Sequence, residues 1–248
     1  MFVLARIPLR ISFCGGGTDF REFAELVGFG EVLSSTIDKY IYVIIKDRFD
    51  DQICINYADL EYVRHVDDIK HDLIREVLRA SGIKRPLEIV TIADVSAKGS
   101  GLGSSSALAV CLVGALREYA KMAWSLRELA AEATRIEIDV LKRPIGLQDQ
   151  YECCYGGFNT IRFLPGEVQI NPLNLSDEII HKLEKRFLLI YLGERRNHVP
   201  DILSKYLNGM HQKRDVLLEI RAQVPAARCM LEEGDFDSFG YELDRAWK

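Results

Sequence analysis

A run of glycines and serines has the composition of a phosphate-binding loop: Lys98-Gly99-Ser100-Gly101-Leu102-Gly103-Ser104-Ser105-Ser106. Glycine lets the backbone approach an anion closely, and a helix that starts here would direct its positive end and its N–H groups to the same place. Serine hydroxyls can hold a phosphate oxygen or Mg²⁺. A Gly/Ser loop without a ligand is the alternative. The run matches neither the Walker A loop nor the G-x-G-x-x-G pattern.

Four charged residues elsewhere are candidates for related chemistry. Glu137 falls on the apolar face of a helix that Ser125 is expected to cap, where a carboxylate is seldom buried without a cation. It is therefore either a metal ligand or the partner of Arg10 or of another cation in the core. Arg10 falls on the polar face of an alternating strand, while Asp19 and Asp149 follow glycine-containing turns. For these three, the alternatives are a strand-surface arginine, a helix N-cap and a turn residue.

Hydrophobic periodicity predicts the elements that would position these residues. Alternation predicts a strand over residues 6–13, and further strands are expected over 40–45, 53–57, 87–92, 158–163 and 186–192. Helical spacing predicts helices over 20–27, 67–80, 105–121, 200–207, 210–223 and 226–233, and a further helix that Ser125 and Glu128 open with a capping box. A turn is expected over 146–151, and Pro165-Gly166 predicts a domain boundary. The chain stops at Ala246-Trp247-Lys248, within an expected helix, which predicts a missing C-terminal portion.

Composition limits the class of protein. The 248 residues, 48% hydrophobic and 28% charged, suffice for one large domain or two small ones. A net charge of −5 argues against nucleic-acid and membrane-surface partners, and no stretch is apolar enough to span a membrane, so a cytoplasmic location is expected. The six cysteines form no C-x-x-C pair, which argues against zinc and disulfide frameworks. The five scattered histidines are interpreted as solvated side chains.

The order of these features resembles the GHMP small-molecule kinases, which include galactokinases, homoserine kinases, mevalonate kinases and phosphomevalonate kinases. The similarity is most specific to the sugar-kinase branch that contains D-glycero-D-manno-heptose 7-phosphate kinase. Three segments carry it: Arg6-Ile7-Pro8-Leu9-Arg10-Ile11-Ser12-Phe13-Cys14-Gly15-Gly16-Gly17-Thr18-Asp19, Ser34-Ser35-Thr36-Ile37-Asp38-Lys39-Tyr40 and Gly146-Leu147-Gln148-Asp149-Gln150-Tyr151. The resemblance implies an α+β fold with two domains. These are a ribosomal-protein-S5-like α/β domain over 1–165 and an incomplete ferredoxin-like α+β domain over 166–248.

The resemblance also implies a role for each candidate residue. Asp149 would be the catalytic aspartate and Arg10 the cation beside it, while Ser105 and Glu137 would bind Mg²⁺. The expected ATP-binding residues are Lys98, Gly99, Ser100, Gly101, Leu102, Gly103, Ser104, Ser105 and Ser106. The expected substrate-binding residues are Gly16, Gly17, Thr18, Asp19 and Arg196. These types suit phosphoryl transfer, which needs donors and a metal on the phosphates, a cation on the developing charge and a carboxylate that accepts the hydroxyl proton.

The function expected from the resemblance is ATP-dependent phosphorylation of the anomeric hydroxyl of a heptose 7-phosphate, for nucleotide-activated heptose in a bacterial surface glycan. Arg6, Arg195 and Arg196 are candidates to bind the phosphate of that sugar. The chain departs from the family pattern at Ala97-Lys98, where proline is common, at Leu192, which replaces a threonine, and in lacking the late glycine-rich third motif. The rival hypothesis is therefore a truncated, catalytically weak regulator that binds sugar or nucleotide. Fucose and galactose are alternative acceptors, and the oligomeric state is left open.

Overall fold

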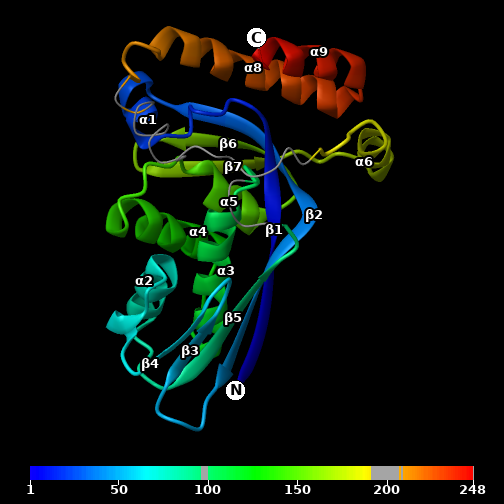
Figure 1. Ribbon diagram of the computed structural model, residues 1–248. Helices are drawn as coiled ribbons and strands as arrows, with labels where there is room; N and C mark the ends of the chain where they lie inside the picture. The colour runs from blue at the N-terminus through cyan, green and yellow to red at the C-terminus, as the bar shows by residue number, and fades with distance from the viewer. Residues whose placement is uncertain (96–99, 191–206, 208, 248) are drawn as a thin grey trace. The chain divides into compact units, whose positions relative to one another are not determined.

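The computed structural model describes residues 1–95, 100–190, 207 and 209–247, which form two compact units (Figure 1). Unit 1 comprises Met1–Leu9, Ile37–Arg143 and Asp149–Tyr155. Unit 2 comprises Arg10–Thr36, Pro144–Gln148 and the described part of Gly156–Lys248. The long strands β1 (Phe2–Cys14) and β2 (Gly30–Asp47) each contribute residues to both units. In the parts of the chain that the structure describes, no helix is long and apolar enough to cross a membrane.

The sheet of unit 1 has the strand order β4-β3-β5-β2, and β1 also pairs with β2. A hairpin joins β3 (Ile53–Asn56) to β4 (Leu60–Val63), and β5 (Leu87–Ala93) lies antiparallel to the part of β2 from Ile41 to Asp47. Strands β3 and β5 are parallel. Parallel neighbours need a crossover connection, which the 3₁₀ turn η1 (Val66–Asp68) and helix α2 (Asp72–Ser81) supply.

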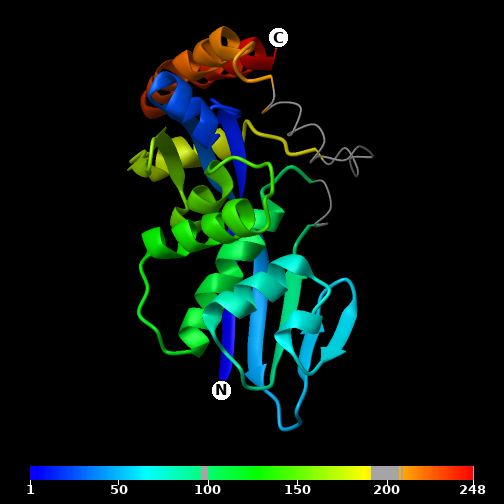
Figure 2. The same ribbon diagram turned by 90° about the vertical axis from the view of Figure 1, so that its left-hand side faces the viewer.

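The helices of unit 1 cover this sheet and carry several site residues. Helices α2 and α3 (Ser104–Tyr119) lie side by side on the strands (Figure 2), and α4 (Leu126–Thr134) packs on α3. A π-helical segment, η2 (Arg135–Val140), continues α4, and α5 (Gln148–Tyr155) follows. The core between helices and strands includes Ile74 of α2, Leu112 of α3 and Ile89 of β5, all fully buried. Burial of this apolar surface fixes α3 on the sheet.

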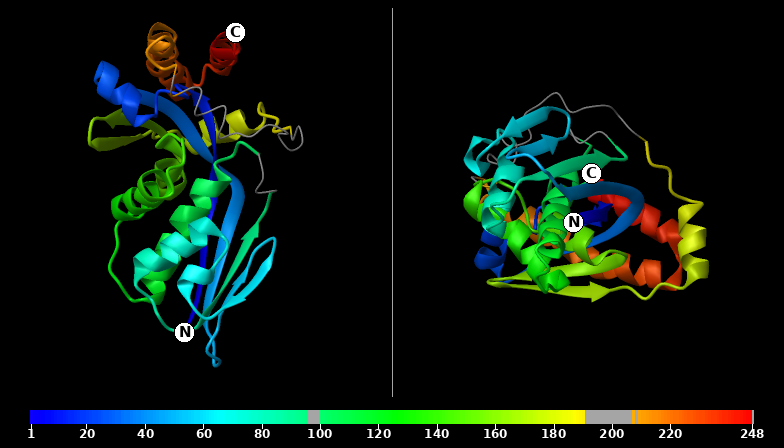
Figure 3. Two further views of the ribbon diagram at one scale, coloured as in Figure 1. Left: turned by 60° about the vertical axis from the view of Figure 1, so that its left-hand side comes forward. Right: turned by 90° about the horizontal axis from the view of Figure 1, so that it is seen from below.

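Unit 2 contains an antiparallel sheet of β2 (residues 30–35), β6 (Phe158–Leu164) and β7 (Glu167–Pro172). Its helices are α1 (Arg21–Val27), α6 (Asp177–Glu184), α8 (Arg214–Glu233) and α9 (Phe236–Trp247). Helices α8 and α9 pack side by side (Figure 3) and bury Val224 and Phe239 against Leu33 of the sheet. A second apolar cluster joins Phe20 and Phe23 to Leu217 of α8.

The expected α+β class is confirmed, and the elements that carry the candidate residues form. Strand β1 contains residues 6–13, α1 falls within 20–27, and α3 covers most of the helix expected over 105–121. The division of residues 210–233 into two helices is wrong, because α8 runs through Pro225. The residues beside this proline, Val224 and Ala227, are buried in the core, and packing there outweighs the hydrogen bond that proline cannot donate. Strands β4 and β7 and helix α6 were not predicted.

Other expectations concern connecting segments. Residues 187–190 form no strand, and the rest of the expected strand, with residues 200–206 of an expected helix, lies outside the described part of the chain. The segment expected as a turn over 146–151 instead begins helix α5 at Gln148. Pro165 and Gly166 form the turn between β6 and β7. The division into domains at this point stays a prediction.

Candidate functional site: a glycine loop, a buried glutamate and a buried aspartate turn

The described end of the glycine loop leads directly into helix α3. Gly101 and Gly103 have φ angles of 75° and 73°, which residues with a side chain rarely adopt. Gly103 is the N-cap, and its carbonyl accepts the N–H of Ala107 at 2.9 Å. The first N–H groups of a helix have no intrahelical acceptor, and a glycine cap offers no side chain to replace it. The N-terminus of α3 therefore has the geometry of an anion site.

Hydroxyls line the same helix end. Ser100 Oγ lies 3.0 Å from Ser104 Oγ, and the buried Ser106 Oγ accepts from Gln150 Nε2 at 3.1 Å. Ser105 is exposed, and its hydroxyl is the one that faces a carboxylate. Lys98 and Gly99 of the predicted loop lie outside the described residues.

Glu137 has no exposed surface, and three side chains bind its carboxylate. Oε1 accepts from Ser105 Oγ at 3.1 Å and from Arg143 Nη1 at 2.9 Å, while Oε2 accepts from Gln150 Nε2 at 2.7 Å. Glu137 stands in the π-helical segment, and residues of that segment also pack on α2 and α3. Single π turns occur frequently at functional sites. Of the alternatives for Glu137, a neighbouring cation is present in the structure, and it is Arg143.

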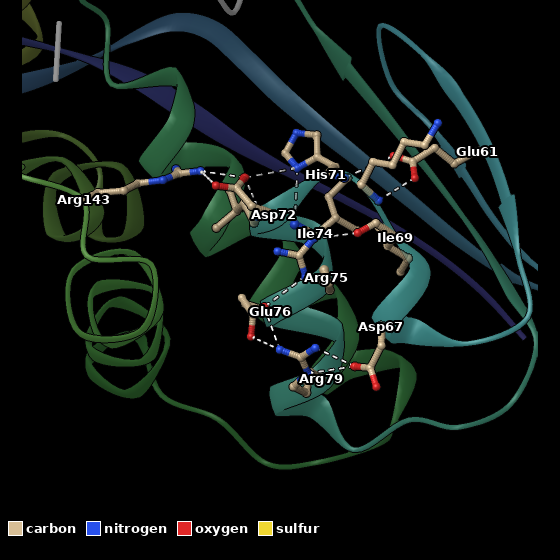
Figure 4. A network of polar contacts seen from close by, with 12 residues as sticks. Glu61, Asp67, Ile69, His71, Asp72, Ile74, Arg75, Glu76, Arg79 and Arg143 are labelled. Carbon is tan, nitrogen blue, oxygen red and sulfur yellow. Dashed lines mark hydrogen bonds and ion pairs between the residues drawn. The ribbon is translucent and has the colours of Figure 1, made fainter.

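Arg143 links this carboxylate to helix α2, and Figure 4 shows its contact with Asp72 of that helix. Its Nη1 also donates to Ser105 Oγ at 2.7 Å, while Nη2 donates to Asp72 Oδ1 and Oδ2 at 3.0 and 3.1 Å. Partial burial raises the pKa of Asp72, but the guanidinium and the Leu73 N–H outweigh it, so the pKa lies below its usual value. The network continues to His71, which caps α2 by accepting the Ile74 N–H.

The Gly-Gly-Thr-Asp turn of unit 2 is built around Asp19. The carboxylate of Asp19 is 7% exposed and accepts from the N–H of Gly17 at 3.0 Å and from that of Gln148 at 3.4 Å, and its carbonyl accepts the Leu147 N–H at 2.9 Å. Asp19 is therefore not the N-cap of α1, a position that Phe20 takes without a side-chain hydrogen bond. Gly146 allows this approach, because a Cβ there would lie 1.9 Å from Asp19 Oδ2.

Thr18 is fully buried beside this aspartate. Its hydroxyl lies within hydrogen-bond distance of the Gly15 and Glu31 carbonyls, at 2.8 and 2.9 Å, and accepts the Glu31 N–H at 3.0 Å. These contacts hold the turn, so a contact with substrate stays a prediction for Thr18, as it does for Gly16 and Gly17.

The remaining predicted residues have these positions. Arg10 is half-buried in β1, and Asp149 is half-buried in the first turn of α5. Arg196 lies outside the described residues, as do Ala97 and Leu192. Sequence reasoning missed Arg143, Asp72 and Gln150 as neighbours of Glu137. Of these three, only Gln150 could have been found from the sequence, because it lies inside the segment 146–151 that resembles the GHMP kinases.

Comparison with known proteins relates the chain to the GHMP kinases. The profile of the GHMP kinases N terminal domain matches residues 68–157, which include α2, the glycine loop, η2 and α5. The D-glycero-alpha-D-manno-heptose 7-phosphate kinase of Campylobacter jejuni is 29% identical over 261 residues, which cover 99% of this chain and 76% of that protein. The chain contains a GHMP kinases N terminal domain and resembles the heptose kinases of that family. It is therefore an ATP-dependent phosphotransferase with an alcohol group as acceptor.

Two further relatives of this GHMP kinase are informative. A crystal structure of a D-glycero-D-manno-heptose 1-phosphate kinase from Bacteroides thetaiotaomicron superposes with a TM-score of 0.85 at 26% identity, over 100% of this chain and 78% of that one. The L-fucokinase/L-fucose-1-P guanylyltransferase of Bacteroides fragilis is 24% identical over 99% of this chain and 30% of its own length. The GHMP kinase fold is thereby confirmed.

The chemistry of Ser105 and Glu137 fits a magnesium ion. Mg²⁺ binds oxygen ligands, and in phosphoryl-transfer sites it takes one or two from the protein and the others from water and phosphate. The structure supplies a hydroxyl and one carboxylate oxygen, and a cationic nitrogen, Arg143 Nη1, already lies against both. Within the described parts of the chain, no group of three or more His, Cys, Asp or Glu is arranged to hold a metal alone.

Proposed function

We propose that this GHMP kinase transfers the γ-phosphate of ATP to the anomeric hydroxyl of a heptose 7-phosphate or a related sugar, for the synthesis of nucleotide-activated heptose. The observation that carries the proposal is the Ser105–Glu137 pair at the glycine-capped start of α3, where the hydroxyl and the carboxylate are 3.1 Å apart. The names of the relatives in Campylobacter jejuni and Bacteroides thetaiotaomicron support a phosphorylated heptose. Those names differ in where the heptose phosphate lies, at carbon 7 or at carbon 1.

The nucleotide half of the proposal uses residues of unit 1. The N–H groups of the first turn of α3 would bind phosphate oxygens of ATP, together with Ser100 and Ser104 of the loop. Ser105 and Glu137 would hold Mg²⁺, which neutralises charge on the phosphates when bound. Full burial of Glu137, and the hydrogen bond from Gln150 to its second oxygen, would fix the direction of the carboxylate. A fixed carboxylate loses little freedom when a ligand arrives.

The acceptor half uses Asp149, Arg10 and Asp19. Asp149 would orient the sugar hydroxyl and accept its proton late in the transfer, and Arg10 would stabilise the developing charge. Asp19 would bind a second sugar hydroxyl through an oxygen that the backbone already holds. Arg6 is a candidate for the sugar phosphate, although its guanidinium stacks on Tyr40 at 4.8 Å. Arg195 and Arg196 stay candidates on sequence alone.

A second acceptor is fucose, because a bifunctional fucokinase aligns with 99% of this chain. A coupled assay of ADP release would separate these acceptors, with heptose 7-phosphate, L-fucose, D-galactose and D-mannose tested at equal concentrations. We expect turnover with heptose 7-phosphate to exceed that with the unphosphorylated sugars. If only fucose or only galactose is turned over, that sugar is the acceptor and the proposed heptose 7-phosphate is not. Nucleotide binding without turnover on any sugar would support the rival of a regulatory protein.

A further inference from the structure

One nitrogen atom occupies the place where the proposed cation would bind. Arg143 Nη1 lies 2.7 Å from Ser105 Oγ and 2.9 Å from Glu137 Oε1, and these are the two oxygens proposed as magnesium ligands. The other terminal nitrogen, Nη2, donates to both carboxylate oxygens of Asp72, as Figure 4 shows. The two ends of one guanidinium therefore contact two different carboxylates.

On the side of the two oxygens where Nη1 lies, a divalent cation and this nitrogen cannot bind both oxygens together. Mg²⁺ lies about 2.0–2.1 Å from its oxygen ligands, and it would meet the N–H hydrogens that Nη1 directs at those oxygens. The two positive charges would also repel each other at this short separation. Binding of the cation therefore requires Nη1 to withdraw.

The chain has a physical reason to keep a cation there. Glu137 has no exposed surface, and a buried carboxylate without a positive partner is strongly unfavourable. Arg143 supplies the positive charge, and its own side chain remains 24% exposed. Asp72 is half exposed and binds Nη2 with both oxygens, so it can hold the guanidinium after Nη1 withdraws.

We propose that Arg143 is the exchangeable counter-ion of the cation site: it neutralises Glu137 when no divalent cation is bound, and Asp72 retains it when the cation takes its place. The proposal rests on the proposed function, because it takes Ser105 and Glu137 as the cation ligands. Arg143 and Asp72 are positioning residues, which control how tightly the cation binds. Removal of either must change that affinity, and the two changes must have opposite signs.

Loss of Arg143 removes a competitor, whereas loss of the Asp72 charge removes the alternative partner of that competitor. Arg143→Met should therefore bind a divalent cation more tightly than the wild type, and Asp72→Asn should bind it more weakly. A structural or phosphate-binding role for the pair would weaken binding in both variants. Arg143→Lys should fall between the wild type and Arg143→Met, because one ammonium cannot replace both ends of the guanidinium.

The test is a titration of the full chain with Mn²⁺ alone, followed by electron paramagnetic resonance. We expect Arg143→Met to bind about tenfold more tightly, the scale of one charge-assisted hydrogen bond, and Asp72→Asn to bind about threefold more weakly. Arg135→Met is the matched control, because Arg135 pairs with Glu132 on the exposed side of the neighbouring turn and should leave binding unchanged. Thermal unfolding gives a second readout: Mn²⁺ should raise the midpoint of Arg143→Met more than that of the wild type.

The Glu137→Gln variant distinguishes failure of this inference from failure of the proposed site. If Glu137→Gln binds Mn²⁺ as well as the wild type, Glu137 is not a ligand and the proposed cation site falls. If Glu137→Gln loses binding while Arg143→Met binds no more tightly than the wild type, the counter-ion proposal is overturned and the site stands. If Arg143→Met does not fold, Asp72→Asn decides, and unchanged or tighter binding in that variant overturns the proposal.

Discussion

Replacement of Gly146 by alanine tests the aspartate turn of this kinase directly. An added Cβ would lie 1.9 Å from Asp19 Oδ2 and 2.5 Å from Asp19 Cγ, distances at which the carboxylate must move. Its two N–H partners, those of Gly17 and Gln148, would then lose their acceptor. A hydrogen bond to a charged group contributes about 1.5–3 kcal/mol, and the contact to Gln148 is long at 3.4 Å. We therefore expect Gly146→Ala to lower the free energy of unfolding by about 2–4 kcal/mol.

The same change should weaken binding of the sugar acceptor and leave binding of the nucleotide unchanged. Because Asp19 is proposed to bind a sugar hydroxyl, its displacement should raise the KM for the sugar and leave nucleotide affinity as in the wild type. Urea unfolding measures the first effect, and ADP release at varied sugar concentration measures the second. Gly240→Ala is the control: it lies inside α9 with nothing within 4 Å of an added Cβ, so it should be neutral or stabilising by up to about 1 kcal/mol. Equal stability and equal sugar KM in both variants would refute the reasoning.

Three further predictions follow from single residues. Asp149→Asn should lower turnover by about 10²–10⁴-fold with unchanged nucleotide affinity in equilibrium binding, and wild-type turnover would remove Asp149 as the base. Ser125→Ala should cost about 1 kcal/mol in urea unfolding, because it removes the capping box with Glu128, and an unchanged midpoint would contradict that cap. Burial lowers the pKa of His71 below its ordinary value of 6.5. The unfolded chain therefore takes up this proton at a higher pH than the folded chain does. As a result, the free energy of unfolding should fall as the pH drops below about 6.5. His71→Asn, which can still cap α2, should flatten that fall in unfolding measured from pH 7 to 5; an unaltered slope would speak against His71.

The sequence predicted elements whose signal is local. The alternation in β1, the helical spacing after the glycine loop and the Ser125–Glu128 pair all specify structure within a few residues, and all three form. The prediction at Pro225 was wrong because it also used only a local preference. Its local preference ends a helix, but burial of Val224 and Ala227 against the core of unit 2 continues α8 through it.

The site shows a similar division. Glu137 was singled out in the sequence because it falls on the apolar face of a helix. In the structure it is fully buried and pairs with a cation. The identity of that cation was not predictable, because Arg143 and Asp72 are 71 positions apart and meet where α2 packs against the π-helical segment that precedes Arg143. Asp19 was expected to be a helix cap or a sugar ligand. Its contact with the Gln148 N–H joins positions 129 apart, which no local pattern encodes.

The most direct test of the central claim is phosphoryl transfer by the wild type and by Glu137→Gln, with ATP and heptose 7-phosphate as substrates. Phosphorus NMR of the product should show a new anomeric phosphate formed in step with ADP by the wild type. The rate for Glu137→Gln should be lower by at least about 100-fold, because this variant lacks the carboxylate that is proposed to hold the cation. A wild-type rate in Glu137→Gln, or ADP formed without a sugar phosphate, would contradict the account.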